Sequence, residues 1–312
     1  MENYTDKSPL TGRINPFLGI VSILFIAFGF YIVLSFISLL LVEPLFNTSS
    51  VEIAEVISGN VIEIEESTRQ ALFFIQGISA LGAFIFAPLF YIFFIEQKNT
   101  KVLLGNQQFT FLTVVLTTVI TISFMPVNSI IAEWNMGAEF PDFMEGWARQ
   151  QEDAARAATE ALTNITSPGY LLVSFLIIAI IPAIGEELLF RGILQNKLWE
   201  ASNIHLAIWI TGIIFGVIHL QFYGVIPRII LGVIFGYLYY WSATLWVPII
   251  AHFVNNGFTL LLLYMNNTGQ LNYDIEDQEM PYSTVIPFTI IFVAAMIYFY
   301  RYMEQKKNER LA

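Results

Sequence analysis

Three charged side chains lie within six residues of a strongly apolar stretch, in the segment GEELLFRG at positions 185–192. Glu187 and Arg191 are four residues apart with the acid on the N-terminal side, a spacing that favours an ion pair on one face of a helix. Glu186 is rotated by about 100° from Glu187 around such a helix, so it cannot share Arg191 as readily. We therefore expect Glu186 to be an unpaired carboxylate in apolar surroundings, where it could act as a general base.

Two further polar clusters follow along the chain. Phe215 and His219 are four residues apart in FGVIH, and His252 and Asn256 have the same spacing in HFVNN. A carboxylate, two imidazoles and an amide can hold and activate one water molecule, and can then stabilise the oxyanion that forms when this water attacks a carbonyl. Together with Glu186, these side chains are suited to the hydrolysis of a peptide bond.

Other catalytic templates fit the sequence poorly. It contains no Gly-x-Ser-x-Gly elbow, no phosphate loop, dinucleotide fingerprint or His-Glu-x-x-His motif, and no cysteine that could act as a nucleophile. Zinc is an alternative, because Glu186, His219 and His252 resemble a catalytic site with three ligands and one open position. Another group would then have to serve as base, and Glu187 could do so only by leaving Arg191. The metal-free and zinc-bound alternatives both stay open.

The elements that must position these residues are membrane helices. The chain has 312 residues, of which 56% are hydrophobic and 12% charged, with a mean hydropathy of +0.65, whereas soluble domains carry about 25% charged residues. A spanning helix needs roughly 20 mostly apolar residues. The sequence predicts an all-α polytopic membrane protein with about eight transmembrane helices, near 17–42, 71–95, 109–131, 169–190, 204–222, 225–243, 245–265 and 284–300.

The two halves of the chain differ in kind. The first three predicted helices carry no ionisable group in their apolar centres, whereas the polar clusters all lie after residue 168. We interpret 1–168 as three N-terminal membrane helices with acidic outer loops, 169–265 as the catalytic core, and 266–312 as the last membrane helix with a basic tail. The first apolar run is longer than a signal-peptide core of roughly 7–15 residues, so we expect a retained anchor.

The distribution of basic residues predicts a multi-pass protein of the cytoplasmic cell membrane with both termini in the cytoplasm. Ten of the 14 Lys and Arg residues then lie inside: Lys7, Arg13, Lys98, Lys101, Arg191, Lys197, Arg301, Lys306, Lys307 and Arg310. Acidic residues of 43–66, 133–160 and 274–279 lie outside and account for most of the net charge of −11. The chain has no basic patch, which argues against a nucleic-acid partner.

The longest segment outside the predicted spans is 132–167. Phe140, Phe143, Met144 and Trp147, followed by an alanine-rich stretch, predict a helix that lies on the membrane surface. It could be a gate over a substrate path or a solvated connector, and the sequence does not choose between them. Glycines four residues apart, at 212 and 216 and at 232 and 236, predict close packing between the helices of the second half.

The three motifs together resemble those of the CPBP intramembrane proteases, the group that contains the CAAX prenyl endopeptidases and bacterial proteins linked to bacteriocin self-immunity. Glu-Glu-x-x-x-Arg stands here as EELLFR (186–191), Phe-x-x-x-His as FGVIH (215–219) and His-x-x-x-Asn as HFVNN (252–256). Any one of these motifs is weak evidence, but all three occur in order over about 90 residues of apolar sequence.

The resemblance implies a helical membrane fold of about eight spans with endopeptidase activity inside the bilayer. It also implies that Glu186 activates water and that His219, His252 and Asn256 orient this water or stabilise the oxyanion. Glu187, Arg191 and Phe215 match supporting positions. Such proteins are often labelled metalloproteases, although the role of metal is contested.

One feature of the predicted topology conflicts with this site. Straight helices place His252 in the inner half of the membrane and His219 near the outer end of its helix, yet both must approach Glu186. At about 1.5 Å of rise per residue, this mismatch amounts to several ångströms. We therefore expect the helix that precedes His219 to be shifted, tilted or broken.

The leading hypothesis is an intramembrane endopeptidase that cuts a membrane-associated peptide or protein. A non-catalytic immunity or scaffold protein that keeps the motifs for binding is the second hypothesis. A proton-coupled transporter is the third, although the sequence lacks the internal repeats that many transporters show.

Overall fold

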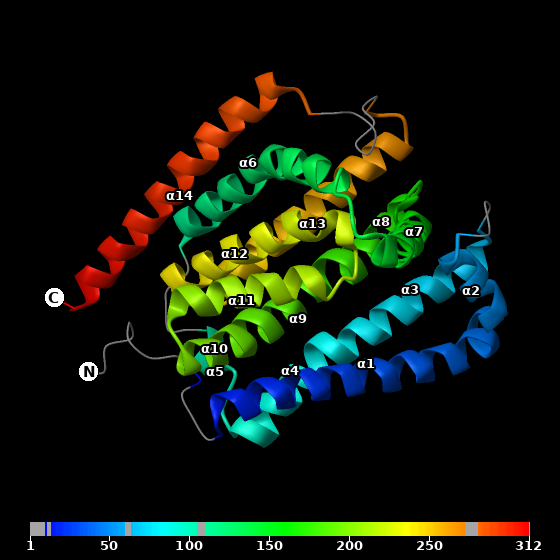
Figure 1. The fold of residues 1–312 in the computed structure, drawn as a ribbon, viewed down its shortest axis with the longest axis horizontal. Helices are drawn as coiled ribbons and strands as arrows, with labels where there is room; N and C mark the ends of the chain where they lie inside the picture. Colours follow the sequence, from blue (N-terminus) through cyan, green and yellow to red (C-terminus); the bar gives the residue numbers. More distant parts are fainter. Residues whose placement is uncertain (1–9, 11–13, 60–63, 105–109, 272–279, 312) are drawn as a thin grey trace.

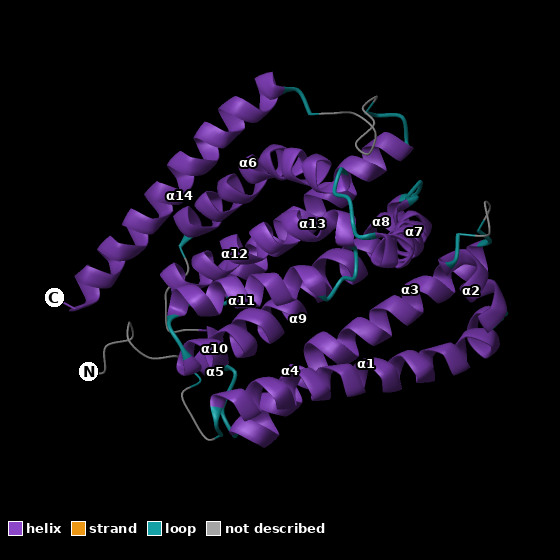
Figure 2. Ribbon diagram, in the orientation of Figure 1, coloured by secondary structure: helices purple, strands orange, loops and turns teal. Residues whose placement is uncertain are grey.

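The computed structural model describes residues 10, 14–59, 64–104, 110–271 and 280–311, and every regular element within these ranges is a helix (Figures 1 and 2). The all-α prediction is therefore confirmed. Lys7, Arg13 and Glu63, and the acidic segment 274–279, lie outside the described residues.

Within the described ranges, seven helical spans are long and apolar enough to cross a membrane. Three are single helices, α1 (Pro16–Phe46), α6 (Phe111–Met136) and α13 (Trp246–Asn267). A fourth is formed by α14 (Tyr282–Leu311), and a fifth by η5 (Phe222–Gly224) with α12 (Val225–Ser242). The other two are composite: α3 (Glu66–Ala80), η1 (Leu81–Phe86), α4 (Ala87–Phe90) and η2 (Tyr91–Glu96) follow one another without a break, as do α8 (Pro168–Ser174), η3 (Phe175–Ile180), α9 (Ile181–Glu187), η4 (Leu188–Gln195) and α10 (Asn196–Ala201).

An eighth apolar helix, α11 (Ile204–Val217), is shorter than the other spans. The prediction extended this helix to residue 222, but a turn begins after Val217, and Leu220 adopts a left-handed backbone conformation with φ of 54°. At about 1.5 Å per residue, 14 residues span roughly 21 Å, less than the hydrocarbon core of about 30 Å. His219 therefore lies in a loop short of the full crossing, as the predicted break in this helix requires.

A helix is present in the predicted segment, as α7 (Asp142–Thr163). Figure 1 shows it end-on, across one end of the bundle, whereas the spanning helices run across the picture. It packs against α2 (Ser50–Ile57), α3, α13 and η5, while Phe143 and Trp147 on it stay exposed. The helix therefore lies over the end of the bundle where the loop of His219 is found.

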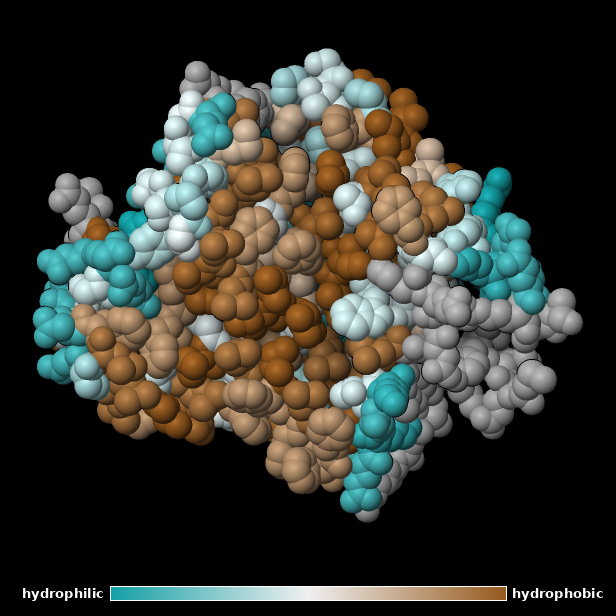
Figure 3. Space-filling model, turned by 180° about the vertical axis from the view of Figure 1, so that it is seen from behind, coloured by the Kyte–Doolittle hydropathy of each residue, from teal (hydrophilic) through white to brown (hydrophobic). Residues whose placement is uncertain are grey.

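The outer surface matches a protein surrounded by lipid. Figure 3 shows a broad hydrophobic band across one face, with hydrophilic residues gathered towards its two ends. Most of the apolar side chains of α1 and α14 are not buried by the rest of the protein. Such large apolar surfaces are expected where a helix faces lipid rather than water. α1 begins and α14 ends at the same end of the bundle (Figure 1).

The glycines of α11 and α12 allow these two helices to pack closely, as predicted. A Cβ atom on Gly212 would stand 2.7 Å from Val233 Cγ2 and 3.1 Å from the carbonyl oxygen of Ile229. One on Gly216 would stand 2.5 Å from Ile229 Cγ1. Because no larger residue fits at either position, backbone contact between these helices depends on glycine.

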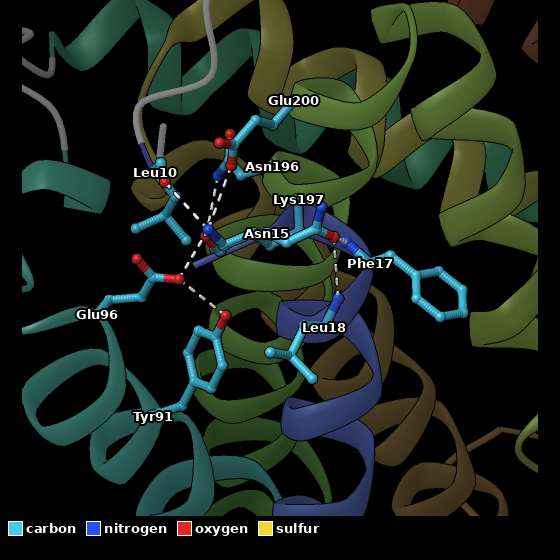
Figure 4. A network of polar contacts seen from close by, with 10 residues as sticks. Leu10, Asn15, Phe17, Leu18, Tyr91, Glu96, Asn196, Lys197 and Glu200 are labelled. Carbon is cyan, nitrogen blue, oxygen red and sulfur yellow. Dashed lines mark hydrogen bonds and ion pairs between the residues drawn. The ribbon is translucent and has the colours of Figure 1, made fainter. Parts of the chain in front are cut away.

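A buried polar network joins the N-terminal helices to the second half at the opposite end from α7 (Figure 4). Lys197 Nζ lies 2.7 Å from Glu96 Oε1, with both side chains fully buried, and the Tyr91 hydroxyl donates to the same oxygen at 2.9 Å. Lys197 also donates to the carbonyl of Leu10 and pairs with Glu200. Lys197, counted by the sequence among the inner charges, is a buried link between α10, η2 and the start of the described chain.

Candidate active site

Glu186 and Glu187 lie at the end of α9, between two π-helical segments of one continuous helix. π-helical turns form hydrogen bonds over five residues and are frequent at functional sites. Pro182 has no N–H to give to the carbonyl of Ile178, four residues earlier. That carbonyl instead accepts a hydrogen bond from Asn256 Nδ2 at 2.9 Å. The proline of α9 thus leaves an acceptor that holds Asn256 of α13 next to this helix.

Glu187 is the centre of a buried network. Its Oε1 accepts a hydrogen bond from Arg191 Nη1 at 2.7 Å, so the ion pair expected from the spacing is present, with both side chains fully buried. The same oxygen lies 2.8 Å from His252 Nδ1. Arg191 Nη2 donates to the carbonyl of Gly232 at 2.7 Å. Glu187 therefore links α9, η4 and α13, with α12 held through Arg191.

The contact with Glu187 determines how His252 is presented. A carboxylate accepts hydrogen bonds, so Nδ1 of His252 carries the proton, and the other ring nitrogen of the neutral imidazole, Nε2, is an acceptor. His252 is only 4% exposed. Glu187 thus orients the His252 ring. From the sequence, Glu187 is expected to pair with Arg191 only.

His219 is held in the same way by a different partner. Its Nδ1 lies 2.8 Å from the carbonyl oxygen of Phe215, and since a carbonyl only accepts, Nδ1 is the donor and Nε2 the free acceptor. The Phe215 ring lies 5.4 Å from the His219 ring and 6.0 Å from that of His252, centroid to centroid. Phe215 also lies 4.9 Å below the guanidinium of Arg191. One phenyl ring therefore contacts both histidines and the arginine of the three motifs.

Glu186 is the polar residue of this group without a bonded partner. It is buried, and within the described parts of the chain it makes no hydrogen bond and no ion pair. Its electrostatic neighbours are His252, Glu187, Arg191 and Arg228, and His219 in turn interacts with Arg228 and His252. The direct contacts thus join Glu187 to His252, and the Phe215 ring joins His252 to His219.

Asn256 is fixed at both ends of its amide group. Besides the hydrogen bond from Nδ2 to Ile178, its Oδ1 accepts from Asn255 Nδ2 at 3.0 Å. An amide nitrogen carries two hydrogens, so one N–H of Asn256 is left for a further acceptor.

Comparison with known proteins supports the same region. Residues 168–258 match the family described as type II CAAX prenyl endopeptidase Rce1-like. All three motifs lie inside this segment. The second half of this chain is thus similar to the CPBP intramembrane proteases that the motifs resemble.

Three bacterial relatives match parts of the chain. They are the "Putative membrane peptidase YdiL" of Bacillus subtilis, 28% identical over 38% of this chain and 46% of its own; the "Membrane-embedded CAAX protease MroQ" of Staphylococcus aureus, 29% identical over 41% and 53%; and the uncharacterized protein YpbD of Bacillus subtilis, 32% identical over 23% and 36%. The chain thus spans about half the length of the first two relatives and less of the third. No solved structure matches the chain significantly.

Arg228 is a residue of the site that sequence reasoning missed. It lies on α12, donates through Nη1 to the carbonyl of Gly224 at 3.0 Å, and donates through Nη2 to the side chain of Gln221. The sequence interpretation placed it only among the outer charges. Its signal was available, because it is the one charged residue of the apolar run 225–243, and a charge in such a run faces partners or a wet cavity.

The residues do not gather into a metal site. Within the described chain, no group of three or more His, Cys, Asp or Glu side chains could hold a metal ion, and one oxygen of Glu187 already has two partners. The predicted set of Glu186, His219 and His252 thus does not form a ligand cluster here, and we derive no step through a metal. Zinc stays a prediction for metal analysis of the purified protein.

Proposed function

We propose that this protein is an endopeptidase that hydrolyses a peptide bond of a membrane-associated peptide or protein by means of activated water. The observation that carries the proposal is Glu186, a buried carboxylate with no described bonding partner, which adjoins Glu187 in sequence and interacts electrostatically with His252. A structural carboxylate in an apolar interior would need its own partner. Here the neighbouring acid Glu187 takes the ion pair and leaves Glu186 for chemistry.

The proposed reaction uses side chains of this chain alone. Glu186 accepts a proton from a water molecule, and the resulting hydroxide attacks the carbonyl carbon of the scissile bond. The remaining N–H of Asn256 stabilises the oxyanion, and the histidines orient the water by accepting its hydrogen bonds through Nε2. Protonated Glu186 then gives its proton to the leaving amine as the C–N bond breaks. Glu187 orients His252, so it supports the reaction without touching the substrate.

The proposal is tested by comparing the membrane proteomes of cells that carry the wild type and Glu186→Gln. Glutamine keeps the size of glutamate but cannot accept the proton, and general-base catalysis contributes about 10²–10⁴-fold. New protein termini present with the wild type should therefore be absent with Glu186→Gln. Glu55→Gln, on the exposed face of α2, is the matched control and should retain them. Unchanged termini in Glu186→Gln, at equal amounts of inserted protein, would refute the role of Glu186.

We also propose that both termini face the cytoplasm of the cell membrane. The support is the shared end of the bundle at which α1 begins and α14 ends (Figure 1), together with the excess of Lys and Arg predicted there. The chain has no cysteine, so single cysteines introduced at exposed Ser50, the first residue of α2, and at exposed Gln305, near the end of α14, report the two sides without background. A membrane-impermeant maleimide added to intact cells should label the first and spare the second. The reverse pattern would overturn the orientation.

A further inference from the structure

The loop that carries His219 is held mainly from outside. α11 ends at Val217, Leu220 turns the chain through a left-handed conformation, and α12 begins after Gly224. Gly224 stands at the N-cap of α12 and has no side chain to accept a hydrogen bond from the free N–H groups there. Arg228 of α12 bonds Gly224 and Gln221 within the loop, whereas the cap for these N–H groups comes from another helix.

Asn135 supplies the missing cap from α6. Its Oδ1 accepts a hydrogen bond from the N–H of Ile226 at 2.8 Å, and its Nδ2 donates to the carbonyl of Phe222 at 3.2 Å. Asn135 is only 3% exposed. One buried amide therefore closes the last part of the loop against the first turn of α12, about 90 residues away in sequence.

α7 holds the same loop from the opposite direction. The hydroxyl of Tyr223 donates to Glu145 at 3.0 Å, and the ring of Phe222 lies 5.0 Å from that of Trp147. Figure 1 shows α7 at the end of the bundle where the chain passes from α11 to α12. Both α6 and α7 lie before residue 168 and thus outside the segment that matches the family.

We infer that Asn135 is a positioning residue for the proposed peptidase reaction, because its double hydrogen bond fixes the loop that carries His219, whose ring contacts Phe215 next to His252. The inference rests on the proposed function. Asn135 acts through His219 and is not a catalytic residue. Loss of its side chain leaves the Ile226 N–H and the Phe222 carbonyl without their partner, so the loop opens more often and His219 spends less time in its working position.

The first test measures the loop without relying on activity. Leu220 is 46% exposed, so Leu220→Cys gives a single maleimide-reactive site in a chain that has no cysteine. We expect Asn135→Ala to raise the labelling rate at this site several-fold, in the full chain reconstituted in vesicles. Asn267→Ala is the matched control, because Asn267 Nδ2 also donates to a distant carbonyl, that of Thr163, at 2.9 Å. Equal labelling rates in the parent and in Asn135→Ala would overturn the inference.

The second test separates positioning from stability. Its probe is a fluorogenic peptide built on a cut site found in the proteome comparison. We expect Asn135→Ala to lower kcat per folded molecule at least tenfold with little change in KM, while Asn267→Ala changes neither. If Asn135→Ala does not insert, Asn135→Asp replaces it, since aspartate keeps the acceptor for Ile226 and loses only the donor. A normal kcat per folded molecule in the inserted variant would contradict the inference.

Glu186→Gln in the same assays separates the two ideas. If it cleaves as well as the wild type, the proposed function fails, yet the labelling comparison still decides whether Asn135 holds the loop. If Glu186→Gln is inactive and the Asn135 variants are fully active with a closed loop, the function stands and the positioning role fails.

Discussion

The buried pair of Glu187 and Arg191 makes a strong quantitative prediction for Arg191→Met. The structure places the two side chains at 2.7 Å with neither exposed to solvent. Methionine fills similar volume but leaves the Glu187 carboxylate with His252 as its one remaining described partner. Breaking a buried pair on one side costs about 3–5 kcal/mol, because a charge is left uncompensated. At 1.4 kcal/mol per factor of ten, the folded-to-unfolded ratio should fall roughly 10²–10⁴-fold.

The same reasoning predicts strong coupling between the two positions. Once Arg191 is methionine, replacing Glu187 by glutamine removes the unpaired charge, so the double variant should be more stable than the sum of the single losses predicts. The coupling should reach about 2 kcal/mol or more, within the range of about 0.5–3 kcal/mol seen for residues in contact. The assay is unfolding in mixed micelles with increasing SDS, followed by the loss of helical circular dichroism.

An exposed pair with the same spacing is the control. Arg156 and Glu160 on α7 are also four residues apart, at 2.9 Å, but their side chains are 63% and 56% exposed. Exposed pairs contribute about 0–1 kcal/mol, so Arg156→Met should change little. Two results would contradict this reasoning: a loss of stability in Arg191→Met no larger than that in Arg156→Met, or single losses at Glu187 and Arg191 that simply add in the double variant. Either result would mean that burial does not determine how much the ion pair contributes to stability.

Four further outcomes follow from other parts of the structure. Gly212→Val should destabilise the protein by about 1–3 kcal/mol through overpacking, whereas Gly29→Val, at a site with open space, should not; micelle unfolding compares them, and equal losses would contradict the role of close packing. Lys197→Met should lower stability by about 3–5 kcal/mol because it removes an ion-pair partner of the buried Glu96, and wild-type stability in the same unfolding assay would contradict this. Partial desolvation works to raise the pKa of Glu145, but hydrogen bonds from Tyr223 and the Phe140 N–H and the Arg149 pair outweigh it and lower that pKa. A carboxylate whose pKa is lowered by folding stabilises the fold at pH values above its pKa in the unfolded chain, and this stabilisation is lost as the pH falls through its pKa in the folded protein. The rate of amide hydrogen exchange in 219–224, corrected for its intrinsic pH dependence, should therefore rise in acid more in the wild type than in Glu145→Gln. Chelation followed by metal analysis tests zinc: the metal-free route predicts unchanged cleavage by the metal-depleted protein, and loss restored by zinc alone would overturn it.

The fold class and the local pairings could be read from the sequence because they depend on spacing along one helix. Runs of about 20 apolar residues have few alternatives to spanning helices. Glu187 and Arg191 meet because residues four apart share a helix face. For the same reason Glu186, one residue earlier, points elsewhere, and the structure leaves it without a described bonding partner. The close approach of Gly212 to α12 follows from composition as well.

Only the tertiary structure decided which groups from different helices meet. His252 turned out to be oriented by Glu187, because α13 packs against α9 at that level. The helix before His219 ends at Val217 although the apolar run continues, and the turn after it is closed by Asn135 of α6 together with Arg228 of α12. The periodicity of hydrophobic residues shows which face of a helix is buried, but it does not show which other helix packs against that face. The sequence therefore identifies the residues whose side chains could take part in catalysis, while packing between helices that are distant in sequence decides which hydrogen bonds orient each of them.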